Sequence, residues 1–448
     1  MKRSRSSRLC FPCSSAHIQI QSRGVKRKHA CFSTAPSCSR GAKRARTALS
    51  ARRDWASLGD DGPACLIAQR VLANDVADYV RFRAVCRPWR RCSVDPRSQG
   101  GLVLDDGRFH PRQWVMLDKA LVAGPRRHRF LNVSTGECIR TDLLLPDLAD
   151  HTLHAVTNEG LLLLLHRPSL VIRLLNPLTR RLTDLPPATT LMTEQQLSRS
   201  RQGGGDLGER LSVYSAGLAV ADDDASTTVM TVAIYFRFPM GIAVAKPGDQ
   251  CWTLVHDRYV TATLSFAGRF YCTIGTSVMV LEDSSATTSD HPRLVMAVKP
   301  SFHMSGMADS LHLVDNAGEL MLVHRLLCKD DNDDAHGEKY KMDYRVYRVD
   351  LDAGALVPAK SLNGRAVFIG RRRAISVRAG AFSSVSADTL YLGSDCDEKT
   401  TMNKIQAYNV ADGSAQPYHH DSCIDMVQPY GVVDCISHCI MGSGRHLL

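Results

Sequence analysis

The sequence predicts a mostly β protein in which a β-propeller follows a short helical segment and a basic N-terminal arm. Three observations support this prediction. After about Gly100, apolar stretches such as "TTVMTVAIYFRF" and "GRFYCTIGTSVMVLED" alternate with turns of Gly, Asp and Asn, which is typical of consecutive short strands. Helical spacing of apolar residues is concentrated in residues 54–95. Residues 1–53 show neither pattern.

Residues 1–53 form the basic arm, which we expect to be disordered. The arm contains 14 Lys or Arg and no Asp or Glu, whereas the remaining chain holds 42 basic and 45 acidic side chains. Because the arm is poor in large apolar residues, it cannot bury enough surface to offset the entropy lost on ordering. The high positive charge therefore belongs to the arm, and the rest of the chain is close to neutral.

Two basic clusters of the arm, separated by 14 residues, resemble a bipartite nuclear-import signal. The candidate residues are Lys26, Arg27, Lys28, Lys43, Arg44 and Arg46. An acid-free arm rich in Ser and Arg also fits an organelle transit peptide, and a solvated tail is the third interpretation. We expect the protein in the nucleus, the cytoplasm or both.

The 15 cysteines are odd in number and are scattered along the chain. Several lie beside apolar residues, as in "FYCTI" and "QCWTLV", which indicates buried free thiols in a reducing compartment. Cys10-x-x-Cys13 and the later Cys31 and Cys38 lack the spacing of a zinc site, so no metal or cofactor is expected. No apolar run reaches the roughly 18 residues that predict a membrane span, so no membrane is expected among the partners.

Residues 54–95 predict three short helices. A preceding aspartate can cap a first helix with Pro63 in its first turn, and Asn74 or Asp75 can cap a second helix that ends near Pro88. Three helices of about 40 residues are too small for an independent core. Either a partner helix covers their apolar stripe, or the segment is a helical appendage packed on the main domain.

The stretch "DYVRFRAVCRPWR", together with an aliphatic pair before it, resembles an F-box. In that family the tri-helical motif binds a Skp-type adaptor, which connects it to a cullin and to the ubiquitin-transfer machinery. The resemblance implies adaptor contacts at Trp55, Leu58, Leu66, Ile67, Val71, Leu72, Tyr79, Val80, Val85, Cys86, Trp89 and Arg90.

The first predicted helix departs from the F-box pattern. Gly59 stands where the family usually has proline, and Gly62 and Pro63 stand where two leucines are usual. Each lost buried leucine removes roughly 1.5–3 kcal/mol of stabilisation. The adaptor contact is therefore less well supported on the first helix than on the second.

Residues 108–440, which follow a linker at 96–107, contain a loosely recurring unit: a strand, an Asn or Asp, a polar turn and another apolar residue. It occurs in "RFLNVSTGECI", "IRLLNPLTRRL", "YRVDLDAGALV" and "AYNVADGSAQP". A spacing near 40–50 residues is typical of four-stranded propeller blades, and the length allows roughly six to eight of them. The late segment "GVVDCISHCIM" can close the ring by pairing with an early strand.

The order of "IRLLNPLTRRLTDLPP", "AKPGDQCWTLV", "LVDNAGELMLV" and "VYRVDLDAGALVPAKSLNGRAVFIG" resembles the propeller-like domain of a large group of plant F-box proteins, the KIB-type β-propeller family. The resemblance implies a kelch-like β-propeller after a tri-helical F-box. In that family the propeller is taken to select a target protein, and the F-box presents it.

No catalytic constellation is recognisable. Gly203, Gly205 and Gly208 match a dinucleotide fingerprint only by letter, because no strand precedes them. No enzymatic activity is therefore expected, and the resemblance implies a substrate-recognition subunit of a Skp–cullin–F-box ubiquitin ligase, which acts by proximity. The alternatives are a propeller protein-binding module with a degenerate F-box that no longer engages the ligase, an enzyme that uses the propeller channel, and non-specific nucleic-acid binding by the arm. Nucleic acid is not an expected partner.

Overall fold

The computed structural model describes residues 62–97, 106–117, 128–141, 150–202, 211, 213–221, 229–236, 240–282, 291–299, 302, 309–329, 340–370, 373–392 and 405–417. All of these residues belong to one unit of the chain, Asp54–Leu448. The basic arm with its import candidates, Trp55, Leu58 and the segment "GVVDCISHCIM" lie outside the described residues.

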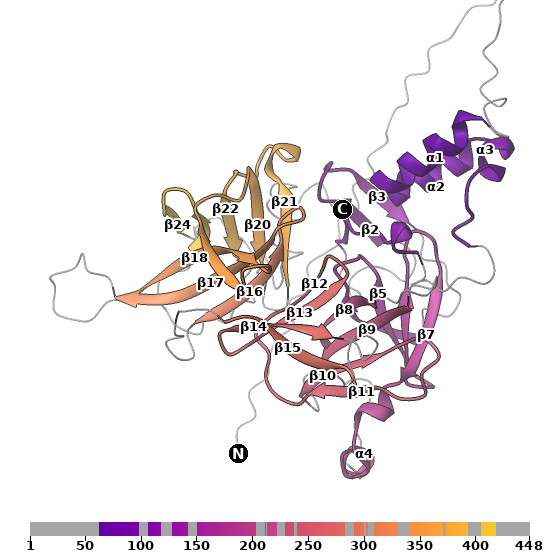
Figure 1. The fold of residues 1–448 in the computed structure, drawn as a ribbon. Helices are drawn as coiled ribbons and strands as arrows, with labels where there is room; N and C mark the ends of the chain where they lie inside the picture. The colour runs from indigo at the N-terminus through magenta and orange to yellow at the C-terminus, as the bar shows by residue number, and fades with distance from the viewer. Residues whose placement is uncertain are drawn as a thin grey trace, which may run out of the picture. The chain divides into compact units, whose positions relative to one another are not determined.

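The predicted helical segment contains α1 (Pro63–Asn74), α2 (Val76–Val85) and α3 (Arg87–Arg91) (Figure 1). Pro63 occupies the first turn of α1, and Gly62 precedes it without a side-chain cap. Asp75 caps α2, because its carboxylate accepts a hydrogen bond from the backbone N–H of Ala77 at 2.6 Å. Three helices, which we name the helical motif, are therefore confirmed.

The strands form six sheets, and within each sheet the strands are named in hydrogen-bonded order. Sheet 1 contains β1 (Trp114–Met116), β2 (His128–Asn132) and β3 (Cys138–Thr141). Sheet 2 contains β4 (His151–Val156), β5 (Leu162–His166), β6 (Val171–Leu175) and β7 (Leu182–Pro187). Sheet 3 contains β11 (Thr253–His256), β10 (Gly241–Ala245), β9 (Val229–Phe236) and β8 (Val213–Ala221).

Sheet 4 contains β12 (Thr263–Phe266), β13 (Arg269–Ile274), β14 (Ser277–Glu282) and β15 (Arg293–Val298). Sheet 5 contains β16 (Ser310–Asp315), β17 (Leu320–Lys329), β18 (Tyr340–Asp350) and β19 (Ala355–Ala359). Sheet 6 contains β21 (Ala374–Arg378), β20 (Arg365–Ile369), β22 (Thr389–Leu392), β23 (Ile405–Asn409) and β24 (Ala415–Pro417). The helix α4 (Glu194–Gln202) and the short helices η4 (Ala188–Leu191) and η7 (Ala379–Ala381) connect strands, and the short helix η2 (Gly107–Phe109) lies between α3 and β1.

Apolar cores between successive sheets close these sheets into a ring. Each neighbouring pair from sheet 1 to sheet 6 shares one buried cluster. A further cluster joins sheet 6 to sheet 1, where Phe368 and Val377 pack with Leu131 and Val115. The fold is therefore a six-bladed β-propeller preceded by short helices, in which sheets 1 to 6 are blades 1 to 6. Six blades lie within the range that the sequence predicts.

The recurring unit of the sequence is confirmed as the outermost hairpin of a blade. Its Asn or Asp is Asn132 at the end of β2, Asn176 directly after β6, Asp350 at the end of β18, and Asn409 at the end of β23. The Asn132 side-chain oxygen accepts the backbone N–H of Ser134 at 2.9 Å, and Asn176 and Asn409 make the same bond two residues onward. This local turn chemistry explains why the unit is visible in the sequence.

The thiol prediction is confirmed in part. None of the seven cysteines among the described residues forms a disulfide: Cys65, Cys86, Cys92, Cys138, Cys251, Cys272 and Cys328. Cys272 is buried as expected, and burial raises the pKa of its thiol to about 12. Cys251 is exposed, so its predicted burial was wrong; its neighbour Trp252 is the residue that enters the core.

None of the described helices has the length and apolar character that a bilayer crossing requires.

A buried histidine in blade 5 is expected to make the protein less stable in mild acid. His312 is buried on β16, and burial together with the Arg325 charge lowers its pKa from 6.5 to about 4. Since the unfolded chain binds this proton more readily, stability is complete above about pH 6.5 and falls as the pH approaches 4; the loss from this group at pH 5 is about 2 kcal/mol. Urea unfolding just above pH 6.5 and at pH 5 measures the loss of stability. The loss should be smaller for His312→Gln than for the exposed control His291→Gln. Equal losses would contradict the assignment.

Candidate functional site

The helix α1 separates its residues between an inner and an outer face. Ala64, Ala68 and Leu72 recur at a spacing of four and are buried, and the two small alanines suit close packing on the neighbouring helices. Leu66 and Ile67 lie on the outer side and are 64% and 41% exposed. The helix therefore offers an aliphatic surface that the described chain leaves uncovered.

The apolar stripe of α2 is used mainly inside the chain. Tyr79 and Phe82 are buried in the core of the helical motif, and Tyr79 donates a hydrogen bond from its hydroxyl to the Val94 carbonyl at 2.8 Å. Burial raises the pKa of Tyr79. Val80 is half-buried, whereas Val85, at the end of the helix, is 63% exposed.

The other residues predicted to contact the adaptor also divide between the interior of the motif and its surface. Trp89 is half-buried and stacks on Phe82, with ring centroids 4.5 Å apart; Cys86 and Val71 are also half-buried, and Arg90 is exposed. Leu72 and Tyr79 belong to the core of the motif rather than to its surface, because their contacts lie within the chain. The aliphatic residues that a partner can reach in the described motif are therefore Leu66, Ile67 and Val85.

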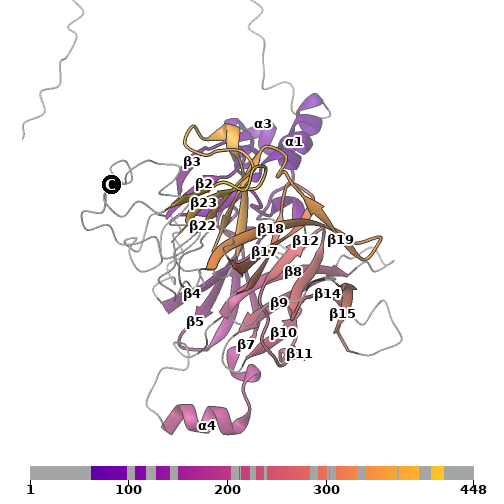
Figure 2. The ribbon, with the colours of Figure 1, turned by 90° about the vertical axis from the view of Figure 1, so that its left-hand side faces the viewer.

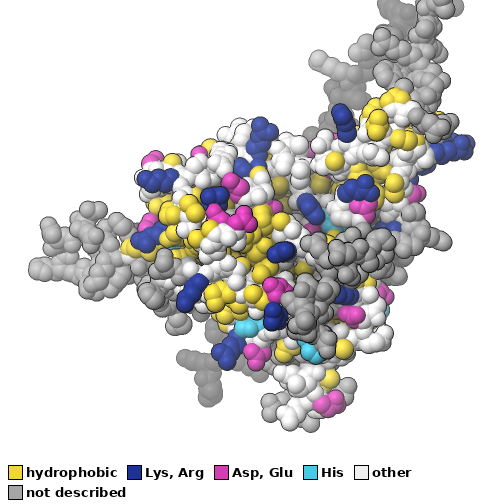
Figure 3. Space-filling model, viewed as in Figure 1, with side chains coloured by type: hydrophobic (Ala, Val, Ile, Leu, Met, Phe, Trp, Pro, Cys, Tyr) yellow, Lys and Arg dark blue, Asp and Glu magenta, His cyan; other side chains and the backbone are white. Residues whose placement is uncertain are grey.

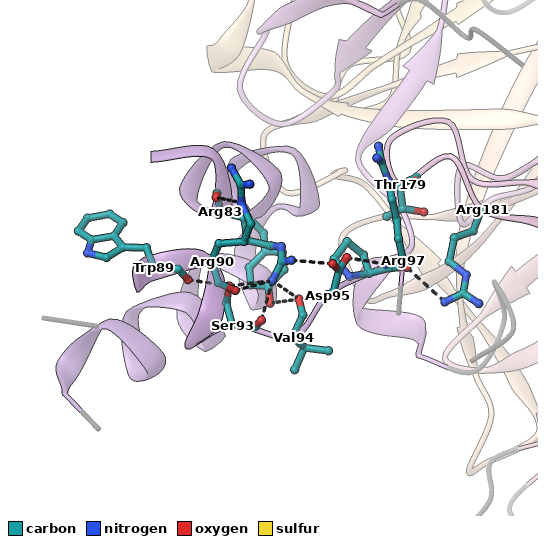
Figure 4. A network of polar contacts seen from close by, with 11 residues as sticks. Arg83, Trp89, Arg90, Ser93, Val94, Asp95, Arg97, Thr179 and Arg181 are labelled. Atoms are coloured by element: carbon teal, nitrogen blue, oxygen red, sulfur yellow. Dashed lines mark hydrogen bonds and ion pairs between the residues drawn. The ribbon is translucent and has the colours of Figure 1, made fainter. Parts of the chain in front are cut away.

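Arg83 organises the segment around α3, although no sequence pattern singles it out (Figure 4). Its side chain is buried, and one terminal nitrogen donates to the carbonyls of Arg90, Ser93 and Val94 at 3.1, 2.6 and 2.8 Å. The other terminal nitrogen pairs with Asp95 at 3.1 Å. Hydrogen bonding by a buried cation thus holds the end of the motif together.

Asp75 fastens the helical motif to blade 1. Besides capping α2, its carboxylate accepts hydrogen bonds from the Trp114 indole N–H at 2.9 Å and from the Asn132 side-chain amide at 2.7 Å. Trp114 and Asn132 are buried, so these donors have no access to water as an alternative. Ala77, the second residue of α2, enters the apolar core between blades 1 and 2.

Blade 2 holds the segment that follows α3. Arg97 donates to the Thr179 carbonyl at 3.0 Å, and Arg181 donates to the Pro96 carbonyl at 3.3 Å. Thr179 and Arg181 belong to the β6–β7 connection, and Asn132 is the last residue of β2, where the β2–β3 connection begins. The motif is therefore attached at the propeller end that carries these outer hairpin turns, and α4 lies at the opposite end (Figures 1 and 2).

A polar cleft of about 490 Å³ lies at the attachment point, between the α1–α2 corner and the start of β1. Asp106 and Arg108 form an ion pair at 2.7 Å beside it, and hydrogen bonding by Arg108 lowers the pKa of Asp106. Among the residues that the structure describes, no group of three or more His, Cys, Asp or Glu could hold a metal ion. The described site thus consists of a helical surface and its attachment to the propeller.

Comparison with known proteins identifies the family to which the propeller belongs. The family model of the KIB1-4 beta-propeller matches residues 114–413, which begin at β1 and end in the β23–β24 turn. This range covers well over half of the chain and leaves the helical motif outside the match. None of the curated proteins compared with the chain matches it. The chain therefore belongs to the KIB1-4 beta-propeller family.

Proposed function

We propose that this protein is a non-catalytic substrate-recognition subunit of a Skp–cullin–F-box ubiquitin ligase. Its helical motif docks the Skp-type adaptor, and its propeller binds a target protein. The observation that carries the proposal is the exposure of Leu66 and Val85, 64% and 63%, on helices that resemble an F-box and are fixed to a propeller.

The exposed aliphatic residues support a docking role because they lie on an otherwise well-ordered motif. Leu66 and Ile67 are adjacent on α1, and Val85 ends α2, so short helices present them to a partner. A groove between partner helices is a common way to cover such side chains. Since Arg83 and Asp75 hold these helices in place, the surface is preorganised for binding.

The position of the motif supports a division of labour within the chain. The helices bind the propeller end that carries the β2–β3 and β6–β7 turns, which leaves the end with α4 for a target (Figure 2). Two docking surfaces on one chain raise the effective concentration of a target near the ubiquitin donor. The chain itself then contributes proximity rather than bond chemistry.

A second candidate function is a propeller protein-binding module whose degenerate F-box no longer engages the ligase. It is favoured by the burial of Leu72 and Tyr79 against the chain's own residues and by the uncapped start of α1 at Gly62. On this alternative the helices serve only as a packed extension of blades 1 and 2.

Substitution at the exposed surface separates the two candidates. We expect Leu66→Asp combined with Val85→Asp to weaken co-purification with a Skp-type adaptor at least tenfold, because two carboxylates replace the aliphatic contact. The matched control is Leu254→Asp on β11, where the side chain is 57% exposed and distant from the motif in sequence. Equal adaptor recovery from both variants, or none from the unmodified chain, would support the second candidate.

A further inference from the structure

Three exposed arginines of the helical motif lack a carboxylate partner among the described residues, as does Arg90, whose Nε donates instead to the Arg83 carbonyl at 3.1 Å. Arg70 lies on α1, four residues after Leu66 and three after Ile67, and therefore on the same side of the helix. Arg87 and Arg91 lie four residues apart on α3. All three are exposed, and none takes part in an ion pair with the described Asp and Glu residues.

The arginines that face the propeller or the interior are neutralised instead. Arg81 pairs with Asp78 and Glu137, and Arg83 pairs with Asp95. Among the described residues of the motif, Arg70 therefore lies beside Leu66 and Ile67 on α1, and Arg87 begins α3 two residues after Val85. Figure 3 shows hydrophobic side chains gathered over the helices with Lys and Arg beside them.

We propose that the adaptor surface which docks on the helical motif is acidic, with Asp and Glu side chains bordering an apolar groove. This inference rests on the proposed function and specifies the chemistry of its partner. Arg70, Arg87 and Arg91 attract that surface before contact, which accelerates association more than it slows dissociation. A nucleic acid is less suitable, because phosphates do not cover Leu66 and Val85.

Association kinetics with a purified Skp-type adaptor test the inference on the full chain. We expect the triple variant Arg70→Gln, Arg87→Gln, Arg91→Gln to associate about tenfold more slowly in about 50 mM NaCl, with a much smaller difference in about 300 mM NaCl. The triple lysine variant should retain the fast rate. A control that removes the same charge from the propeller, Arg258→Gln, Arg269→Gln, Lys360→Gln, should leave the rate unchanged.

The failures of the two proposals are distinguishable. An adaptor that binds the unmodified chain at a rate independent of salt and of the three arginines overturns this inference alone. An adaptor that does not bind the unmodified chain at micromolar concentration overturns the proposed function as well. Binding of a mixed-sequence oligonucleotide that is lost in the arginine variant, while adaptor association is unchanged, assigns the charge to nucleic acid and also overturns the inference.

Discussion

Replacing Arg83 with methionine is expected to release α3 and the segment that follows it. Methionine keeps an apolar stem but leaves the carbonyls of Arg90, Ser93 and Val94 without their buried donor. Each partly buried carbonyl left without a donor costs about 1–3 kcal/mol, whereas the ion pair adds little because the Asp95 side chain is 52% exposed. The loss should be confined to the helical motif, because these partners all lie within it or directly after α3.

Hydrogen exchange measures this effect locally. Amides of α3 should exchange at least about a hundredfold faster in Arg83→Met, which corresponds to roughly 3 kcal/mol of lost protection. Arg87→Met is the matched control, since Arg87 is exposed, and a surface substitution is expected to change stability by less than about 0.5 kcal/mol. Equal protection of α3 in both variants would show that the Arg83 bonds are not structural.

Replacing Asp75 with alanine is expected to loosen the helical motif from blade 1. The change removes the cap of α2, worth about 1 kcal/mol, and leaves the donors of Trp114 and Asn132 without their acceptor in a buried environment. Each such unsatisfied donor costs about 1–3 kcal/mol. These contributions sum to about 3–7 kcal/mol, and relaxation around the site should bring the measured loss toward the lower end of that range.

Limited proteolysis and hydrogen exchange across α1, α2 and blade 1 check this prediction. Asp75→Ala should expose the motif to cleavage while the protection of blades 3 to 5 stays unchanged, because the lost bonds join only the motif and blade 1. Asp78→Ala is the control, since its side chain is 58% exposed and pairs with Arg81 at the surface of the same helix. Indistinguishable cleavage of the two variants would rule out Asp75 as the attachment.

The propeller could be predicted because its signals are local. Each Asn at an outer hairpin, such as Asn132 and Asn176, bonds to backbone N–H groups two residues onward, so a short stretch of sequence contains the whole turn. The number of blades is not local, because it depends on the packing of sheet 6 against sheet 1. The sequence therefore limited the blade count to a range, and the structure sets it at six.

The helical motif was predictable as three helices but not in its orientation. The capping by Asp75 is a local property, whereas its bonds to Trp114 and Asn132 join residues 39 and 57 positions apart. Those contacts turn Tyr79 inward and leave Leu66 outside. Arg83 was not predictable either, since a charged residue is normally exposed and nothing in the sequence shows that three carbonyls converge on it.

The most direct test of the proposed function is a titration of the full-length protein with a purified Skp-type adaptor. We expect a complex of one chain with one adaptor and a Kd below about 1 µM. The complex should be lost when Leu66 and Val85 are replaced by aspartate, and it should be kept when Leu254 is replaced by aspartate. The proposed function would be contradicted if no complex were detected at concentrations tenfold above this Kd. It would also be contradicted if replacing Leu66 and Val85 left the Kd unchanged.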